Sequence, residues 1–90
     1  MICRKYLVAG RVQGVFYRTT AARHARELRI VGYAKNLPDG RVEVLAYGED
    51  AALQEFVNRL WIGSTASKVI SVDIAEASPA PPPPAAFVTA

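Results

Sequence analysis

Apolar residues along this chain recur with the period of a strand in some segments and of a helix in others, and the order of these segments constrains the fold most. Alternating or β-branched runs predict strands at 5–9, 32–35, 41–47 and 68–74. Helical spacing predicts helices at 17–28 and from about 50 to a stop at Gly63. The order strand, helix, strand, strand, helix, strand is typical of the ferredoxin-like βαββαβ fold. We therefore expect an α+β sandwich in which an antiparallel sheet of order 4-1-3-2 is covered on one face by two helices.

Proline marks the end of the predicted domain. Five of the six prolines lie between positions 78 and 84, a composition that favours an extended polyproline segment over a strand. We expect one domain over 1–77, followed by a Pro-rich segment and tail over 78–90. The run Phe87-Val-Thr in that tail is compatible with a short additional edge strand or with a frayed end.

The composition narrows the class of protein. The 90 residues are 51% hydrophobic, which is enough for a core, and no apolar run is long enough for a secretion signal or a membrane span. We therefore expect a soluble, cytoplasmic monomer. The single cysteine, Cys3, cannot form an intrachain disulfide. One histidine, one cysteine and scattered acids offer no metal site, and His24 lacks the partners of a catalytic triad.

The segment Gly10-Arg-Val-Gln-Gly-Val-Phe-Tyr-Arg18 joins the first strand to the first helix. Glycines allow a loop to turn several backbone N–H groups toward one point, and a helix N-terminus adds further donors for an anion. Arg18 supplies a planar group that binds two phosphoryl oxygens at once. The segment thus predicts a phosphate cradle. For the later arginines of this helix, Arg23, Arg26 and Arg29, the simplest interpretation is a solvated face.

The predicted topology brings a second polar residue to the same place. Strands one and two of this fold run in the same direction with strand three between them, so their C-terminal ends lie at one edge, roughly 10 Å apart. Asn36 ends strand two in the turn sequence Asn-Leu-Pro-Asp-Gly40. We therefore expect Arg18 and Asn36 to flank one small cavity.

These motifs resemble those of the acylphosphatase family. The resemblance rests on residues 10–18, on residues 32–42 with Asn36 and Asp-Gly, and on the Leu60–Gly63 segment before a valine-rich strand. It implies hydrolysis of acyl phosphates to carboxylate and phosphate, without a metal or cofactor. It further implies that Arg18 binds the phosphoryl group and that Asn36 positions the attacking water. The implied phosphate-binding residues are Val12, Gln13, Gly14, Val15, Phe16, Tyr17 and Arg18.

Three positions depart from the family pattern. Arg29 stands where the first helix usually ends in glycine, Ser64 replaces a usual proline and Ser67 a usual alanine. We expect these changes to lower stability and not activity.

An alternative function is a non-catalytic ferredoxin-like module with a binding or regulatory role, whose ligand would be an anion or RNA. RNA-binding sheets of this kind present aromatic side chains on their central strands. Tyr6 and Tyr47 are the side chains that such a surface would expose, although the paired aromatic motif on strand three is absent. We therefore expect a small acyl phosphate as the partner, and neither a specific nucleic acid nor a membrane.

Overall fold

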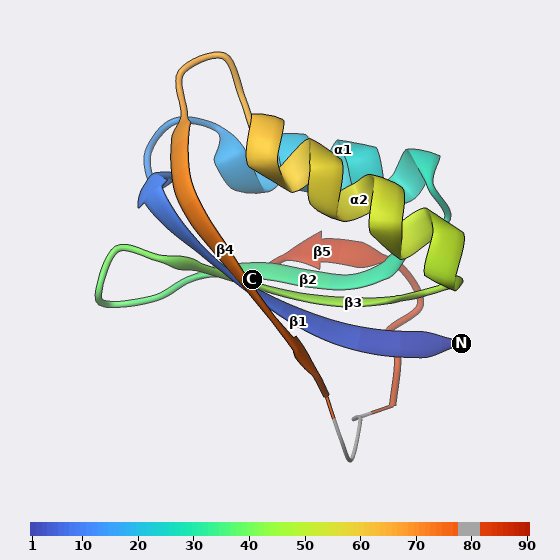
Figure 1. Ribbon diagram of the computed structural model, residues 1–90. Coiled ribbons are helices and arrows are strands. Elements are labelled where there is room, and N and C mark those ends of the chain that lie inside the picture. Colours follow the sequence, from blue (N-terminus) through green and yellow to red (C-terminus); the bar gives the residue numbers. More distant parts are fainter. Residues whose placement is uncertain (78–81) are drawn as a thin grey trace.

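Two helices and five strands are arranged as a two-layer α+β sandwich in the computed structural model, which describes residues 1–77 and 82–90 (Figure 1). The sheet order is β4-β1-β3-β2-β5, so the predicted order 4-1-3-2 is confirmed, with β5 added at one edge. In chain order the elements are β1 (Ile2–Arg11), α1 (Tyr17–Glu27), β2 (Val31–Asn36), β3 (Val42–Gly48), α2 (Asp50–Ile62), β4 (Lys68–Glu76) and β5 (Phe87–Thr89).

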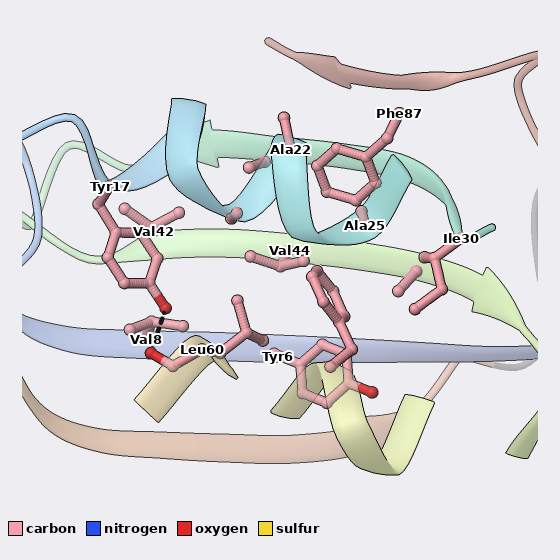
Figure 2. Close-up of a cluster of buried hydrophobic side chains, with 14 of the residues drawn as sticks. Tyr6, Val8, Tyr17, Ala22, Ala25, Ile30, Val42, Val44, Leu60 and Phe87 are labelled. Carbon is pink, nitrogen blue, oxygen red and sulfur yellow. Dashed lines mark hydrogen bonds between the residues drawn. The ribbon is translucent and has the colours of Figure 1, made fainter. Parts of the chain in front are cut away.

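The two helices lie on the same face of the sheet, and the core fills the space between that face and the helices (Figures 1 and 2). Alternation along β3 turns Val42, Val44 and Ala46 inward, where each is fully buried. From α2, Leu53, Phe56 and Leu60 complete the core at helical spacing. The packing follows directly from the two periodicities in the sequence.

The short strand β5 closes the edge of the sheet and contributes to the core. It pairs in parallel with β2, unlike the antiparallel pairs elsewhere in the sheet. Phe87 is 1% exposed, and its ring meets that of Phe56 edge-on with centroids 5.9 Å apart. The extra edge strand is thus confirmed. The expected polyproline conformation falls partly on residues 78–81, which lie outside the described residues, and 82–84 belong to no helix or strand.

Tyr6 and Tyr47, the side chains that an RNA-binding surface would expose, are both buried. Tyr6 is 1% exposed because it faces the helices, where its ring packs edge-on against Phe56. Tyr47 is 4% exposed on the opposite face, in a small cluster with Cys3 and Leu45 that packs against Ala77. Neither ring is available for base stacking, so the RNA-binding alternative loses its surface.

The first helix ends in a left-handed turn at Arg29, whose φ is 59°. The Ile30 N–H donates to the Ala25 carbonyl at 2.8 Å, and the Arg29 N–H donates to the Arg26 carbonyl at 3.2 Å. This is the Schellman arrangement, which satisfies the last helical carbonyls and usually employs glycine at this position. In the part of the chain that the structure describes, no helix is long and apolar enough to cross a membrane.

Candidate active site

The loop between β1 and α1, residues 12–16, leaves the sheet at a β-bulge. The register between β1 and β4 shifts between Ala9 and Gly10. Gly10 has a φ of +128°, and a Cβ at this position would lie 2.1 Å from the Lys68 carbonyl oxygen. Only glycine therefore allows β1 to bend here against β4.

Two further left-handed residues shape the loop itself. Gly14 has a φ of 73° and Phe16, the N-cap of α1, has a φ of 63° with its ring 79% exposed. Val12 is buried before this turn, and Tyr17 is buried after it. The Tyr17 hydroxyl donates to the Leu60 carbonyl at 2.7 Å (Figure 2), and burial raises the pKa of this hydroxyl. The buried side chains of Val12 and Tyr17 thus fix the two ends of the turn that contains Gly14 and Phe16.

Side chains on both sides brace the loop. The Gln13 Nε2 donates to the carbonyls of Leu37 at 2.8 Å and Arg41 at 2.9 Å, in the connection between β2 and β3. From the opposite side, the Ser64 Oγ donates to the Val15 carbonyl at 2.6 Å. Because a trans peptide points its C=O and N–H in opposite directions, this contact turns the Phe16 N–H away from Ser64.

A cavity of about 250 Å³ opens where the loop meets the end of β2. Arg18, in the first turn of α1, and Asn36, the last residue of β2, both line it, as the topology predicted. The Arg18 Nη1 donates to the Ala90 carbonyl at 2.8 Å, and the Ala90 N–H donates to the Ala34 carbonyl at 2.8 Å. The residue after β5 therefore holds the guanidinium beside β2.

The structure distributes the residues suggested by sequence over three places. Those that line the cavity are Val12, Gly14, Phe16, Tyr17, Arg18 and Asn36. The Gln13 side chain instead reaches the β2–β3 connection, and Val15 lines a neighbouring cavity. Thr19 lines the site and was not predicted; its hydroxyl in the first turn of a helix beside an arginine is the one signal that could have indicated it.

The electrostatic character of the cavity suits an anion. Of the described residues that line it, Arg18 alone carries a charge. The Oδ1 of Asn36 is buried and has no hydrogen-bond donor among the described residues. A buried acceptor without a donor typically costs about 1–3 kcal/mol, so the carboxamide is not explained by the fold alone. Across the described ranges, no three His, Cys, Asp or Glu side chains gather as metal ligands would.

Comparison with known proteins agrees with the motifs. The family model described as acylphosphatase matches residues 4–88. An acylphosphatase from Alkalilimnicola ehrlichii is 48% identical over 79 residues, which are 88% of this chain and 89% of that protein. One from Thermus thermophilus is 52% identical over 68 residues, or 76% of this chain and 77% of that protein.

Solved structures show the same relationship in three dimensions. The crystal structure of acylphosphatase from Bacillus subtilis superposes with a TM-score of 0.94 at 37% identity, covering 100% of this chain and 99% of that one. The structure of an acylphosphatase from Coxiella burnetii gives a TM-score of 0.90 at 32% identity, covering 99% and 92% of the two chains. The resemblance seen in the motifs is thereby confirmed: the chain belongs to the acylphosphatase family.

Proposed function

We propose that the cavity between the β1–α1 loop and Asn36 hydrolyses acyl phosphates, releasing a carboxylate and inorganic phosphate without a metal ion. The observation that carries this proposal is the convergence of Arg18, Asn36 and the left-handed loop on one cavity of about 250 Å³. A carboxylate leaves readily, so the reaction requires little general-acid assistance. Its main demands are a fixed phosphoryl group and a water placed in line with the bond that breaks.

Arg18 and the backbone N–H groups of residues 12–18 meet the first demand. Charge in phosphoryl transfer accumulates on the three equatorial oxygens, and fixed donors aimed at those oxygens lower the barrier. Arg18 spends one donor on Ala90 and makes no other hydrogen bond with the described residues. Its remaining N–H groups are thus available for phosphoryl oxygens.

Asn36 meets the second demand. An uncharged carboxamide can accept a hydrogen bond from water and orient it, but it is too weak a base to remove the proton. The unpaired Oδ1 supports this role, because it is an acceptor that the protein itself leaves unused. In our proposal, the water attacks phosphorus, the bond to the carboxylate oxygen breaks, and the proton passes to a phosphate oxygen of the substrate.

All groups invoked here come from one chain, and we propose that the enzyme acts as a monomer. The single free thiol, Cys3, is buried in β1 and suits the reducing conditions of the cytoplasm, where we place the protein.

An Arg18→Ala variant tests the proposal. Phosphate release from benzoyl phosphate should fall by about 10³-fold or more, because the principal cation of the site is lost. Inorganic phosphate should also bind far more weakly, while the circular dichroism spectrum stays unchanged. Arg29→Gly is the matched control, since it removes the same charge from the far end of α1. Near-normal turnover by Arg18→Ala would remove the residue from the mechanism, and loss of wild-type activity in a chelator would contradict a metal-free reaction.

Asn36→Ala separates binding from chemistry. If Asn36 orients water, kcat should fall by roughly 10²-fold while the affinity for inorganic phosphate changes little. Titration of phosphate into the variant, together with steady-state kinetics on benzoyl phosphate, distinguishes the two effects. A change confined to phosphate affinity would show that Asn36 binds the anion and leaves the water to another group.

A further inference from the structure

A second cavity of about 250 Å³ adjoins the first on the far side of Phe16. Its floor is formed by Val15 and Phe16 of the loop. Its walls come from Thr20 and Arg23 of α1 and from Ser64 and Thr65, which precede β4. Phe16 lines both cavities, and its side chain is exposed. A molecule held at the first cavity can therefore extend over Phe16 into the second.

The sheet order places the two cavities where an in-line reaction needs them. Asn36 ends β2, whereas Ser64 and Thr65 lead into β4, and β2 and β4 lie on opposite sides of β1 in the sheet. In an in-line displacement, the leaving group departs opposite to the attacking water. With the water at Asn36, the acyl group of the substrate therefore points toward the β4 side, where the second cavity lies.

Arg23 gives this second cavity its chemical character. It follows Thr20 by three positions, so the two side chains share a face of α1. Arg23 is exposed, and its guanidinium makes no hydrogen bond or ion pair with any residue within 1–77 and 82–90. The other residues named as its walls and floor are hydroxyl-bearing or apolar, so an incoming anion meets one cation and no carboxylate among them.

We infer that the second cavity is a subsite for the acyl group, and that Arg23 favours acyl phosphates whose acyl chain ends in a second anionic group. The inference rests on the proposed function, because it assigns the part of the substrate that the first cavity does not hold. Arg18 and Arg23 are five residues apart, which separates them by roughly 7.5 Å along the helix axis and by about 140° around it, so an acyl chain would have to run past Phe16 to bring its far end to Arg23. Thr20 and Thr65 supply hydroxyl groups to polar atoms along that chain.

Two synthetic substrates of similar shape test this subsite. Glutaryl phosphate carries a terminal carboxylate, whereas valeryl phosphate ends in a methyl group. Wild-type enzyme should show a kcat/KM about two- to fivefold higher for glutaryl phosphate at low salt, the range that an exposed ion pair provides. The preference should shrink as ionic strength rises. Arg23→Gln should bring the ratio to about one, and Arg23→Glu should reverse it.

Arg29→Gln is the control, because it removes a charge just beyond the C-terminal end of α1, away from the cavity, and should keep the wild-type ratio. Equal kcat/KM values for the two substrates in wild-type enzyme, or a ratio that survives Arg23→Gln, would overturn the subsite while leaving the hydrolase in place. Wild-type enzyme that hydrolyses neither substrate would overturn the proposed function itself, and the subsite with it.

Discussion

Phe16 and Arg29 are two non-glycine residues with positive φ, and the left-handed backbone has a different role at each position. A side chain in the left-handed region costs roughly 1–2 kcal/mol relative to a relaxed backbone. At Phe16 the strain lies at the cavity, which is where strain commonly accompanies function. At Arg29 it lies at the far end of α1 and only closes a helix.

Arg29→Gly should therefore stabilise the protein. Glycine adopts a φ of 59° without steric conflict, and the Schellman hydrogen bonds remain available. We expect a gain of about 1 kcal/mol, which for a domain of this size raises Tm by roughly 4–8 °C. Calorimetry of Arg29→Gly beside Arg29→Ala makes the comparison, because alanine removes the charge and keeps the strain. Equal Tm values for the two variants would show that charge, and not backbone geometry, sets the effect.

Much of the residue-level site could be predicted because its signals are local. Gly10, Gly14 and Arg18 lie within nine consecutive residues where β1 passes into α1, and Asn36 begins a turn whose position in the fold is fixed by strand order. The contacts of Arg18 with Ala90 and of Ser64 with Val15 had no such signal. They join residues far apart in sequence and depend on side-chain rotamers that only the folded structure defines.

Among the elements, the β1–α1 loop is the one whose shape depends most on its neighbours. Gln13 ties it to the β2–β3 connection and Ser64 ties it to the segment before β4. The sequence suggested that serine at position 64 weakens the fold. The structure gives its hydroxyl a specific contact with the loop, and its backbone N–H a further bond to the Ser67 Oγ at 2.8 Å.

Ser64→Ala should loosen the loop without unfolding the protein. Once the Val15 carbonyl loses its donor, the peptide between Val15 and Phe16 is no longer held in one orientation, so phosphate affinity should fall several-fold. The loss should appear mainly in KM for benzoyl phosphate, with a smaller change in kcat. Ser64→Thr keeps the hydroxyl and should restore binding. Identical phosphate affinities for wild type and Ser64→Ala would exclude a positioning role.

Element boundaries and covered faces were harder to predict than element order. The alternation of apolar residues predicted β1 and β4 but made both strands too short. Ile2, Arg4 and Glu76 belong to these strands because they pair with neighbouring strands, and they do not continue the alternating apolar pattern. Alternation separated the two faces of the sheet but did not reveal that Ala77 covers Tyr47 on the open face. Burial of this kind is a tertiary property: Tyr6 packs against Phe56 under the helices, and Tyr47 lies in the cluster against which Ala77 packs.

At the scale of the whole molecule, β5 links the core to Arg18 and the candidate active site. Phe87 packs against Phe56, its carbonyl accepts a hydrogen bond from Arg26 at 3.0 Å, and Ala90 beyond it reaches Arg18. The segment 78–90, which composition sets apart from the domain, thus ends inside the same sheet.

Phe87→Ala should destabilise the protein by about 3–5 kcal/mol, as expected for removal of a fully buried aromatic ring. That is a large part of the stability of a small domain, and urea unfolding with a constant m value would measure it. Val88→Ala is the matched control, since Val88 is 45% exposed on the same strand and should change little. A loss below 1 kcal/mol for Phe87→Ala would mean that β5 docks without supporting the core.

The hydrogen bonds that Gln13 and Ser64 make at the β1–α1 loop affect how the substrate preference of such an enzyme can change. If these hydrogen bonds hold the β1–α1 loop in its binding conformation, the loop loses little conformational entropy when an anion binds. The same hydrogen bonds limit which substitutions the loop tolerates. New substrate preferences must then arise at its outer rim, around Phe16 and Arg23, where side chains can be exchanged while the phosphorus chemistry is inherited intact.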